Sequence, residues 1–295
     1  MNDVHYDKPT ARFKLTRVGV SGIRKPICVT RPDKETRLTA TIDLYVDLPA
    51  THKGSHMSRN VEVLDDAVND ACAEPTGGVE MYAAGLARAL LQRHEYATFS
   101  EAHISADYFL DKAAPSGRKT TEVYRLEASA FGTREPARIR VKKAIGVEVV
   151  GMTSCPCAME GVRELMVAEK PECAASMRNL PVVTHNQRNI TSLRMDVPDG
   201  SDIEADLLID IVERSLSSPT REILKRRDEA ELVYQAHRNP KFVEDVVRGV
   251  LEQVVEKFAS FPDDVEVIVK SVSQESIHKH DAMAERVTTL GELRA

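Results

Sequence analysis

The chain has 295 residues, which is enough for two modules of ordinary size or one large domain. Its formal net charge of −6 at pH 7 argues against nucleic acid as a partner, because phosphate backbones favour basic protein surfaces. No apolar run approaches the ~20 residues that a membrane helix needs. The polar segment Met1–Arg12 lacks the apolar core of a secretory signal, so we expect a cytoplasmic protein without a membrane partner.

The five cysteines are scattered and odd in number. In a reducing cytosol such cysteines are free or metal-bound more often than paired in disulfides. We therefore expect no disulfide framework from Cys28, Cys72, Cys155, Cys157 and Cys173.

The first half of the chain predicts strands that flank a pair of helices. Apolar and polar residues alternate in the strands and recur at helical spacing in the helices. Gly146 interrupts the last strand and predicts a bulge there. After a polar leader at 1–14, the expected elements are strands at 17–27 and 39–48, helices at 61–73 and 79–94, and strands at 96–110, 121–130 and 137–152.

A loop with several cationic side chains follows the second expected strand. Gly54 marks the loop, and His52, Lys53, His56 and Arg59 surround it. These side chains could face phosphate groups. On spacing alone, however, a solvated turn is the better interpretation.

The second half predicts a helix and a loop over 158–183, strands at 189–197 and 265–273, and helices at 202–217 and 240–258. Ser201 or Asp202 would cap the first of the two later helices. Asn239 would cap the second, and Pro240 suits a first helical turn. Antiparallel strands with helices grouped on one face give an α+β fold.

Cysteine and histidine occur at the two ends of the 158–183 segment. Cys155 and Cys157 are separated by one proline, and His185 lies in a run of polar side chains. Thiolate and imidazole are common ligands of zinc and ferrous iron. The spacing fits no zinc finger, and free cysteine is often a small buried apolar residue, so spacing alone leaves both interpretations open.

Several charged residues downstream allow more than one role. Glu229 on its own is typical of a surface acid, and Glu244 lies beside the apolar stripe of its helix, where Arg248 could pair with it. His278 and His280 would point the same way in a strand or loop. Together with Glu275 they suit general acid–base chemistry or a second metal site.

Four motifs in one order along the chain resemble a known family. They are SCPC at 154–157, THNQR at 184–188, PKFVED at 240–245 and ESIHKH at 275–280. The chain is similar to the type IB GTP cyclohydrolases over roughly residues 15–290, and the wording KGSHMSR at 53–59 also recurs in that family. The long segment between SCPC and THNQR resembles the archaeal branch.

The resemblance implies the tunnelling fold, in which two ββααββ modules follow one another and their sheets join across subunits into a barrel. The first module would span 15–150. The second would span 151–295 and carry most of the metal and catalytic residues. The family also implies a homotetramer with active sites at subunit interfaces.

The resemblance further implies a metal site in which Cys155, His185 and Glu229 bind one ion, with Cys157 as an alternative or additional ligand. Three protein ligands and an open position are typical of a catalytic site, and the open position would hold the attacking water. Archaeal members use Fe²⁺, whereas Mn²⁺ or Zn²⁺ serve in bacterial ones. The other implied roles are substrate binding by Glu244, Arg188, His56 and Arg59, and catalysis by Cys155, Glu275, His278 and His280.

The implied reaction is attack on C8 of the guanine ring of GTP, with release of formate. In the archaeal branch the product is 7,8-dihydroneopterin 2′,3′-cyclic phosphate, a precursor of methanopterin. The folate branch instead makes 7,8-dihydroneopterin triphosphate. Three other hypotheses are another tunnelling-fold enzyme acting on a purine or pterin, a non-catalytic metal-binding protein, and a redox protein using the two neighbouring thiols.

Overall fold

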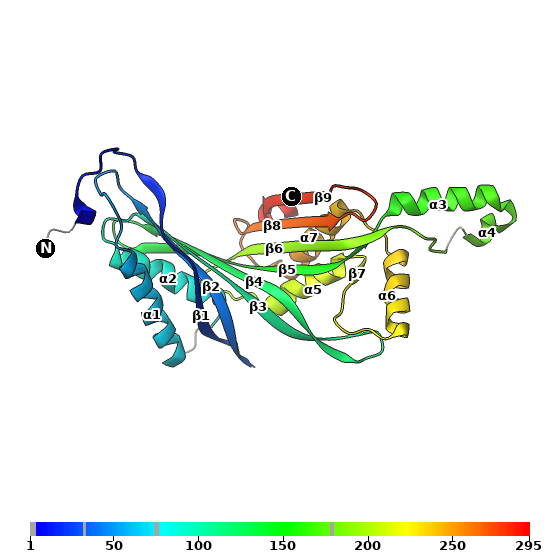
Figure 1. The fold of residues 1–295 in the computed structure, drawn as a ribbon, viewed down its shortest axis with the longest axis horizontal. Coiled ribbons are helices and arrows are strands. Elements are labelled where there is room, and N and C mark those ends of the chain that lie inside the picture. The colour runs from blue at the N-terminus through cyan, green and yellow to red at the C-terminus, as the bar shows by residue number, and fades with distance from the viewer. Residues whose placement is uncertain (1–3, 32–33, 74–76, 178–179) are drawn as a thin grey trace. The chain divides into compact units, whose positions relative to one another are not determined.

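The computed structural model describes residues 4–31, 34–73, 77–177 and 180–295 (Figure 1). They form two compact units. Unit 1 comprises Met1–Tyr108, Arg125–Ile145 and Asp196–Asp202, and unit 2 comprises Phe109–Tyr124, Gly146–Met195 and Ile203–Ala295. Among the described residues, no helix is long and apolar enough to span a membrane.

Long antiparallel strands and shorter helices make up both units. The strands are β1 (Leu15–Arg31), β2 (Lys34–Leu48), β3 (Phe99–Ala113), β4 (Lys119–Arg134), β5 (Ile139–Ser154), β6 (Asn186–Val197), β7 (Ser218–Pro219), β8 (Glu266–Gln274) and β9 (Ala282–Thr289). The helices are α1 (Met57–Ala73), α2 (Val79–Arg93), α3 (Pro156–Glu169), α4 (Ala174–Met177), α5 (Ala205–Ser215), α6 (Arg226–Arg238), α7 (Val243–Lys257) and α8 (Leu290–Arg294). Two short 3₁₀ helices are η1 (Val4–Tyr6) and η2 (Pro171–Cys173). The predicted α+β class is confirmed.

In unit 1, strand β2 pairs antiparallel with β1 on one side and β3 on the other. Ile42 lies opposite Ile23 of β1 and Ile104 of β3. The β1–β2 register shifts before Ile23, where Gly22 adopts a positive φ of 70° and donates its N–H to Asp43 Oδ1 at 2.6 Å. Glycine adopts a positive φ without steric cost, so Gly22 is suited to the β-bulge that causes this register shift.

Helices α1 and α2 contact each other and pack on strands β1 and β2. Their apolar faces meet the inward side chains of the strands, as the helical spacing of these residues predicts. The core of this layer is fully buried and includes Ile42, Leu44, Leu64, Leu86 and Leu90.

In unit 2, strand β8 pairs antiparallel with β6 and β9. Ser271 of β8 lies opposite Thr191 and Ala284, and β7 pairs with the end of β5 through Met152 and Ser218. Helices α5 and α7 pack on each other, and α7 covers β8 and β9. Helix α7 buries Val246, Val250 and Val254 on one face, so its predicted apolar stripe is confirmed.

The start of the last long helix differs from the prediction. Helix α7 begins at Val243 with Phe242 as its N-cap residue, not at Pro240. Asn239 instead ends α6, and its side-chain amide donates to the carbonyl oxygen of Leu216 at 3.1 Å. Because that amide is already used, the cap predicted at Asn239 is wrong.

The cap predicted for the preceding helix is also wrong. Helix α5 begins at Ala205 after the N-cap residue Glu204, so neither Ser201 nor Asp202 caps it. Strand β5 includes Gly146 in its interior, and the bulge expected there stays a prediction. Helix α6 and strand β9 are not predicted by the sequence pattern, and the remaining expected strands and helices are confirmed with shifted ends.

Candidate active site

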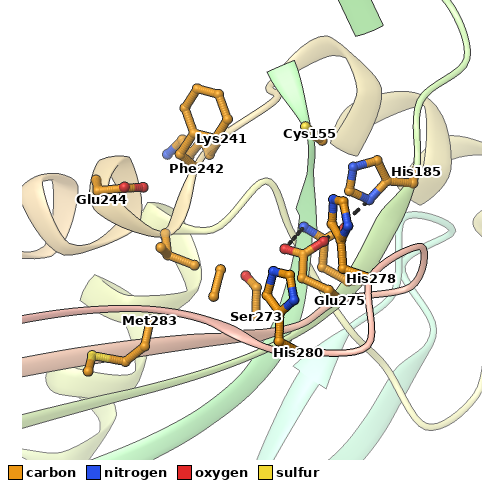
Figure 2. A pocket seen from close by; sticks show the side chains of 13 residues that line it. Cys155, His185, Lys241, Phe242, Glu244, Ser273, Glu275, His278, His280 and Met283 are labelled. Carbon is orange, nitrogen blue, oxygen red and sulfur yellow. Dashed lines mark hydrogen bonds and ion pairs between the residues drawn. The ribbon is translucent and has the colours of Figure 1, made fainter. Parts of the chain in front are cut away.

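A cavity of about 430 Å³ in unit 2 gathers residues from the SCPC, THNQR, PKFVED and ESIHKH motifs (Figure 2). These stretches are far apart in the sequence. The cavity is lined by Cys155, His185, Gln187, Lys241, Phe242, Val243, Glu244, Ser273, Glu275, His278, His280, Ala282 and Met283.

Cys155 joins strand β5 to helix α3 and is held by backbone contacts. It is the N-cap of α3, with Pro156 at the first helical position, and its Sγ accepts the N–H of Ala158 at 3.4 Å. Its own N–H donates to the carbonyl oxygen of His185 at 3.1 Å, and Thr184 Oγ1 donates to the Cys155 carbonyl oxygen at 2.8 Å. These backbone contacts bring the segment of Cys155 next to the segment of His185, which a metal site made of both residues needs.

His185 and Glu275 form a nearly buried pair. His185 Nδ1 lies 3.6 Å from Glu275 Oε2, and the two side chains are 11% and 10% exposed. Gln187 Nε2 donates to the other carboxylate oxygen, Oε1, at 3.2 Å. At 3.6 Å the imidazole and carboxylate make no hydrogen bond, and both facing atoms lack a partner within the part of the chain that the structure describes.

The two histidines after β8 lie side by side. The ring centroids of His278 and His280 are 5.2 Å apart with an interplanar angle of 19°, so the prediction that they point the same way is confirmed. The His278 ring stands edge-on to His185, with centroids 6.4 Å apart. Three imidazoles and the Glu275 carboxylate thus lie close together as candidate proton donors and acceptors.

The segment before α7 closes another side of the cavity. The Lys241 N–H donates to the Ser154 carbonyl oxygen at 3.0 Å, and Lys241 Nζ donates to the Ser215 carbonyl oxygen at 2.8 Å. Burial lowers the pKa of the Lys241 ammonium. These bonds tie the segment to the end of β5 and the last turn of α5, which fixes where α7 starts.

Glu244 lies in the first turn of α7, where its exposed carboxylate lines the cavity. The suggested pairing with Arg248 is not the one observed, because Arg248 pairs with Asp245 at 3.1 Å. Glu244 therefore remains directed to a ligand or to solvent.

Three predicted site residues of unit 2 do not line the cavity. Glu229 is exposed on α6, while the neighbouring Asp228 is buried and accepts the Ser116 N–H at 2.7 Å. Arg188 is exposed on β6, and Cys157 is exposed in the first turn of α3. None of these three joins Cys155 in the lining of the cavity.

His56 and Arg59 belong to unit 1, in and just after the loop that precedes α1. The ring of His56 lies 4.1 Å from that of His5 and 5.5 Å from that of Tyr6, between centroids. Arg59 reaches the carbonyl oxygen of Arg93 at 3.5 Å. The cationic loop predicted around Gly54 therefore exists as a cluster of imidazole, phenol and guanidinium groups.

Sequence reasoning missed Gln187, Lys241 and Ser273 as lining residues. Gln187 lies in the THNQR motif and Lys241 in the PKFVED motif. Their closeness in sequence to His185 and Glu244 was the signal that could have identified them. The signal for Ser273 is weaker. Ser273 lies on the buried face of β8, where Val267 and Val269 earlier on the same face are apolar.

The cavity offers donors that suit a transition metal. Cys155 supplies a half-buried thiol, and His185 Nδ1 and Glu275 Oε2 are buried without a hydrogen-bond partner in the described residues. Thiolate, imidazole and carboxylate are the ligand types of Zn²⁺ and Fe²⁺ sites. Within the described ranges no three Cys, His, Asp or Glu side chains converge to hold an ion, so the donor chemistry fits a metal while the coordination shell is not formed.

Comparison with known proteins identifies the family. The family model described as Type I GTP cyclohydrolase folE2 matches residues 1–284. The chain belongs to this family. It is therefore a GTP cyclohydrolase, and the resemblance carried by the four motifs is confirmed.

Relatives match almost the whole chain. A protein from Methanococcoides burtonii named GTP cyclohydrolase MptA is 42% identical over 302 residues, covering 99% of this chain and 95% of the relative. A protein of the same name from Methanobrevibacter smithii is 40% identical over 304 residues, covering 99% and 96%. The archaeal affinity predicted from the long 158–183 segment agrees with both.

Among solved structures, urate oxidase from Bacillus sp. TB-90 resembles the chain with a TM-score of 0.50 and 9% sequence identity, covering 93% of this chain and 99% of that one. At this identity the likeness concerns the fold alone. It supports an antiparallel α+β architecture.

Proposed function

We propose that the chain hydrolyses GTP at C8, releases formate and forms 7,8-dihydroneopterin 2′,3′-cyclic phosphate, in the cytoplasm. The observation that carries this is the single cavity that joins the Cys155, His185, Glu244 and His278 motifs. The product follows the relatives named GTP cyclohydrolase MptA, which match the chain from end to end. A cavity of about 430 Å³ falls within the usual range for sites of small molecules.

The proposed cofactor is Fe²⁺, with Mn²⁺ or Zn²⁺ as substitutes. Cys155 and His185 would hold the ion, and Glu229 is the third ligand that the family resemblance implies. Because Glu229 is exposed on α6, it is accessible to a site shared between subunits. Such an ion, when bound, lowers the pKa of water and makes it nucleophilic at neutral pH.

The chain's own residues then bind GTP and move protons. The Glu244 carboxylate can accept two N–H bonds from the guanine edge, the N1–H and the 2-amino group. His278 lies beside His185, and His280 lies beside His278. Either histidine can protonate a nitrogen of the five-membered ring of guanine as that ring opens. Glu275, fixed by Gln187, can accept a proton from the attacking water.

The phosphate groups require cations. We assign this role to Arg188, His56 and Arg59. Arg188 is exposed on β6, and His56 and Arg59 belong to the cationic loop of unit 1.

The proposed assembly is a homotetramer of tandem tunnelling-fold modules with shared active sites. Strand β9 supports it with the exposed apolar side chains of Met283 and Val287, which are 57% and 54% exposed. Exposed apolar side chains on a strand are typical of surfaces that are covered on assembly. Light scattering that found a fully active monomer would exclude a shared site.

The test is an anaerobic assay of protein loaded with Fe²⁺ and supplied with GTP. Formate is measured directly, the pterin by its fluorescence after oxidation, and the phosphates of the product by mass spectrometry. Formate with a cyclic monophosphate supports the proposal, whereas formate with an intact triphosphate assigns the chain to the folate branch. No formate with iron, manganese or zinc would refute the proposed reaction.

A further inference from the structure

A network of buried polar side chains lies directly beneath the cavity. Thr153 of β5, Asn189 and Thr191 of β6, and Ser271 and Ser273 of β8 are each at most 1% exposed. Five such groups side by side in the interior of a sheet are unusual, because a buried polar group without a partner costs free energy. Ser273 is the one member that lines the cavity.

The side-chain amide of Asn189 organises this network. Its Nδ2 donates one hydrogen to Ser271 Oγ at 2.8 Å and the other to Ser273 Oγ at 3.0 Å. Its Oδ1 accepts from Thr191 Oγ1 at 2.6 Å. Both hydrogens of Asn189 Nδ2 are therefore used, and Ser273 Oγ is the acceptor of one of them.

The remaining contact of Ser273 is with Thr153, whose Oγ1 lies 3.0 Å away. Either hydroxyl could donate across this contact. Thr153 is fully buried, and within the described chain its hydroxyl has no other partner. If Ser273 donated, the Thr153 hydrogen would be buried without an acceptor, at a free-energy cost that the opposite direction avoids.

Thr153 therefore donates to Ser273, and Ser273 accepts two hydrogen bonds, from Thr153 and Asn189. Its own O–H hydrogen is left without a protein acceptor among the described residues, on the residue that borders the cavity (Figure 2). We infer that Ser273, oriented by the buried network, donates a hydrogen bond to the substrate. The acceptor is the O6 carbonyl oxygen of the guanine ring.

The choice of O6 rests on the proposed function. Guanine presents two adjacent donors, the 2-amino group and N1–H, and next to them one acceptor, O6. A carboxylate such as Glu244 accepts from the two donors, and O6 then needs a donor from the same cavity. Ser273 and Glu244 both line it, so the pair would distinguish guanine from adenine, which carries an amino group in place of O6.

The experiment uses two ligands that bind without turnover. One is 7-deaza-GTP, which keeps O6 but has a carbon at position 7, so that C8 cannot be hydrolysed. The other is 6-thio-7-deaza-GTP, which keeps N1–H and the 2-amino group but carries sulfur, a weak hydrogen-bond acceptor, in place of O6. Dissociation constants of both are measured by calorimetry on the iron-loaded enzyme, for wild type, Ser273→Ala and Ser271→Ala.

In wild type we expect the ligand with O6 to bind about tenfold more tightly, as for one hydrogen bond into a dry site. In Ser273→Ala the two ligands should bind equally. Ser271→Ala is the matched control, because Ser271 lies on the same face of the same strand and contacts the same Asn189, but does not line the cavity. It should keep the tenfold preference even though its stability falls.

Equal preference for O6 in wild type and Ser273→Ala would overturn the inference, as would loss of the preference in Ser271→Ala. The calorimetry requires no catalysis, so it separates this inference from the proposed reaction. Ser273-dependent recognition of O6 in an enzyme that releases no formate would refute the reaction alone. Formate release by an enzyme indifferent to O6 would refute the role of Ser273 alone.

Discussion

Acidification below neutral pH is expected to destabilise the protein through His94 of unit 1. This imidazole is fully buried between Asn60 Oδ1, 2.6 Å from Nε2, and the hydroxyl of Tyr96, 3.1 Å from Nδ1. Burial, followed by the positive charges of Arg59 and His56, lowers the pKa of His94 from 6.5 to about 4. Neither hydrogen-bond partner is a carboxylate, so a charged imidazole is not compensated there.

The sign follows from proton uptake. Between pH 6.5 and 4 the unfolded chain binds a proton at His94 and the folded chain does not, so acidification favours the unfolded state. Stability is therefore full above pH 6.5 and declines as the pH falls toward 4. With these two pKa values the loss at pH 5 relative to pH 8 is about 2 kcal/mol.

The assay is urea unfolding, followed by circular dichroism at pH 8 and pH 5, of wild type and of His94→Gln. Glutamine can hydrogen-bond to Asn60 but does not titrate, so the variant should lose about 2 kcal/mol less than wild type on acidification. His237→Gln, at a partly exposed position on α6, is the control for removing a histidine and should behave as wild type. Equal losses in wild type and His94→Gln would refute this account of His94.

Three further predictions concern the site and the backbone. Cys155→Ser should lose bound iron, measured by metal analysis, and formate release, whereas Cys157→Ser should keep both. Glu244→Gln should raise KM for GTP by about 10- to 100-fold, as for a lost charge-assisted pair, and an unchanged KM would exclude guanine binding by Glu244. Gly19→Ala should cost about 1–3 kcal/mol in urea unfolding, because its Cβ would lie 1.9 Å from the Leu44 carbonyl oxygen. Gly85→Ala, in open space on α2, should instead stabilise by about 1 kcal/mol.

Much of the fold could be predicted because apolar residues recur at a regular spacing, every second residue in the strands and along one face in the helices. Strand β4 buries every second residue over most of its length, and the apolar stripe of α7 is equally regular. The ends of elements depend on tertiary contacts that the sequence does not display. The start of α7 moves to Val243 because Lys241 bonds to Ser154 and Ser215. Strand β9 escaped prediction because most of its side chains are not buried.

The site was predictable in a different way. Spacing left Cys155 and His185 with two interpretations, and only the resemblance of four motifs joined them to Glu244 and Glu275. The structure then brings these four residues to one cavity. It leaves Glu229 outside, on the exposed side of α6, as expected for the surface acid that its sequence context alone indicates.

The buried face of the unit 2 sheet explains why its polar residues belong to the site. Along β6 the buried positions pass from Gln187, Asn189 and Thr191 to the apolar Leu193 and Met195. Strand β8 runs antiparallel to it and passes from Val267 and Val269 to Ser271 and Ser273. The polar ends of both strands therefore coincide.

Helix α7 packs on β8 and β9, and the polar ends of β6 and β8 lead into the cavity through Gln187 and Ser273. A polar layer in a sheet interior weakens apolar packing and persists only when its groups satisfy one another. Among the described residues, each hydroxyl and amide of Thr153, Asn189, Thr191, Ser271 and Ser273 finds a partner, and the hydrogen of Ser273 is the donor left over. The amide oxygen of Gln187, which also lines the cavity, is a buried acceptor without a partner. A fully paired layer would be structural, whereas a layer with one unpaired donor at the cavity wall is suited to hold a ligand.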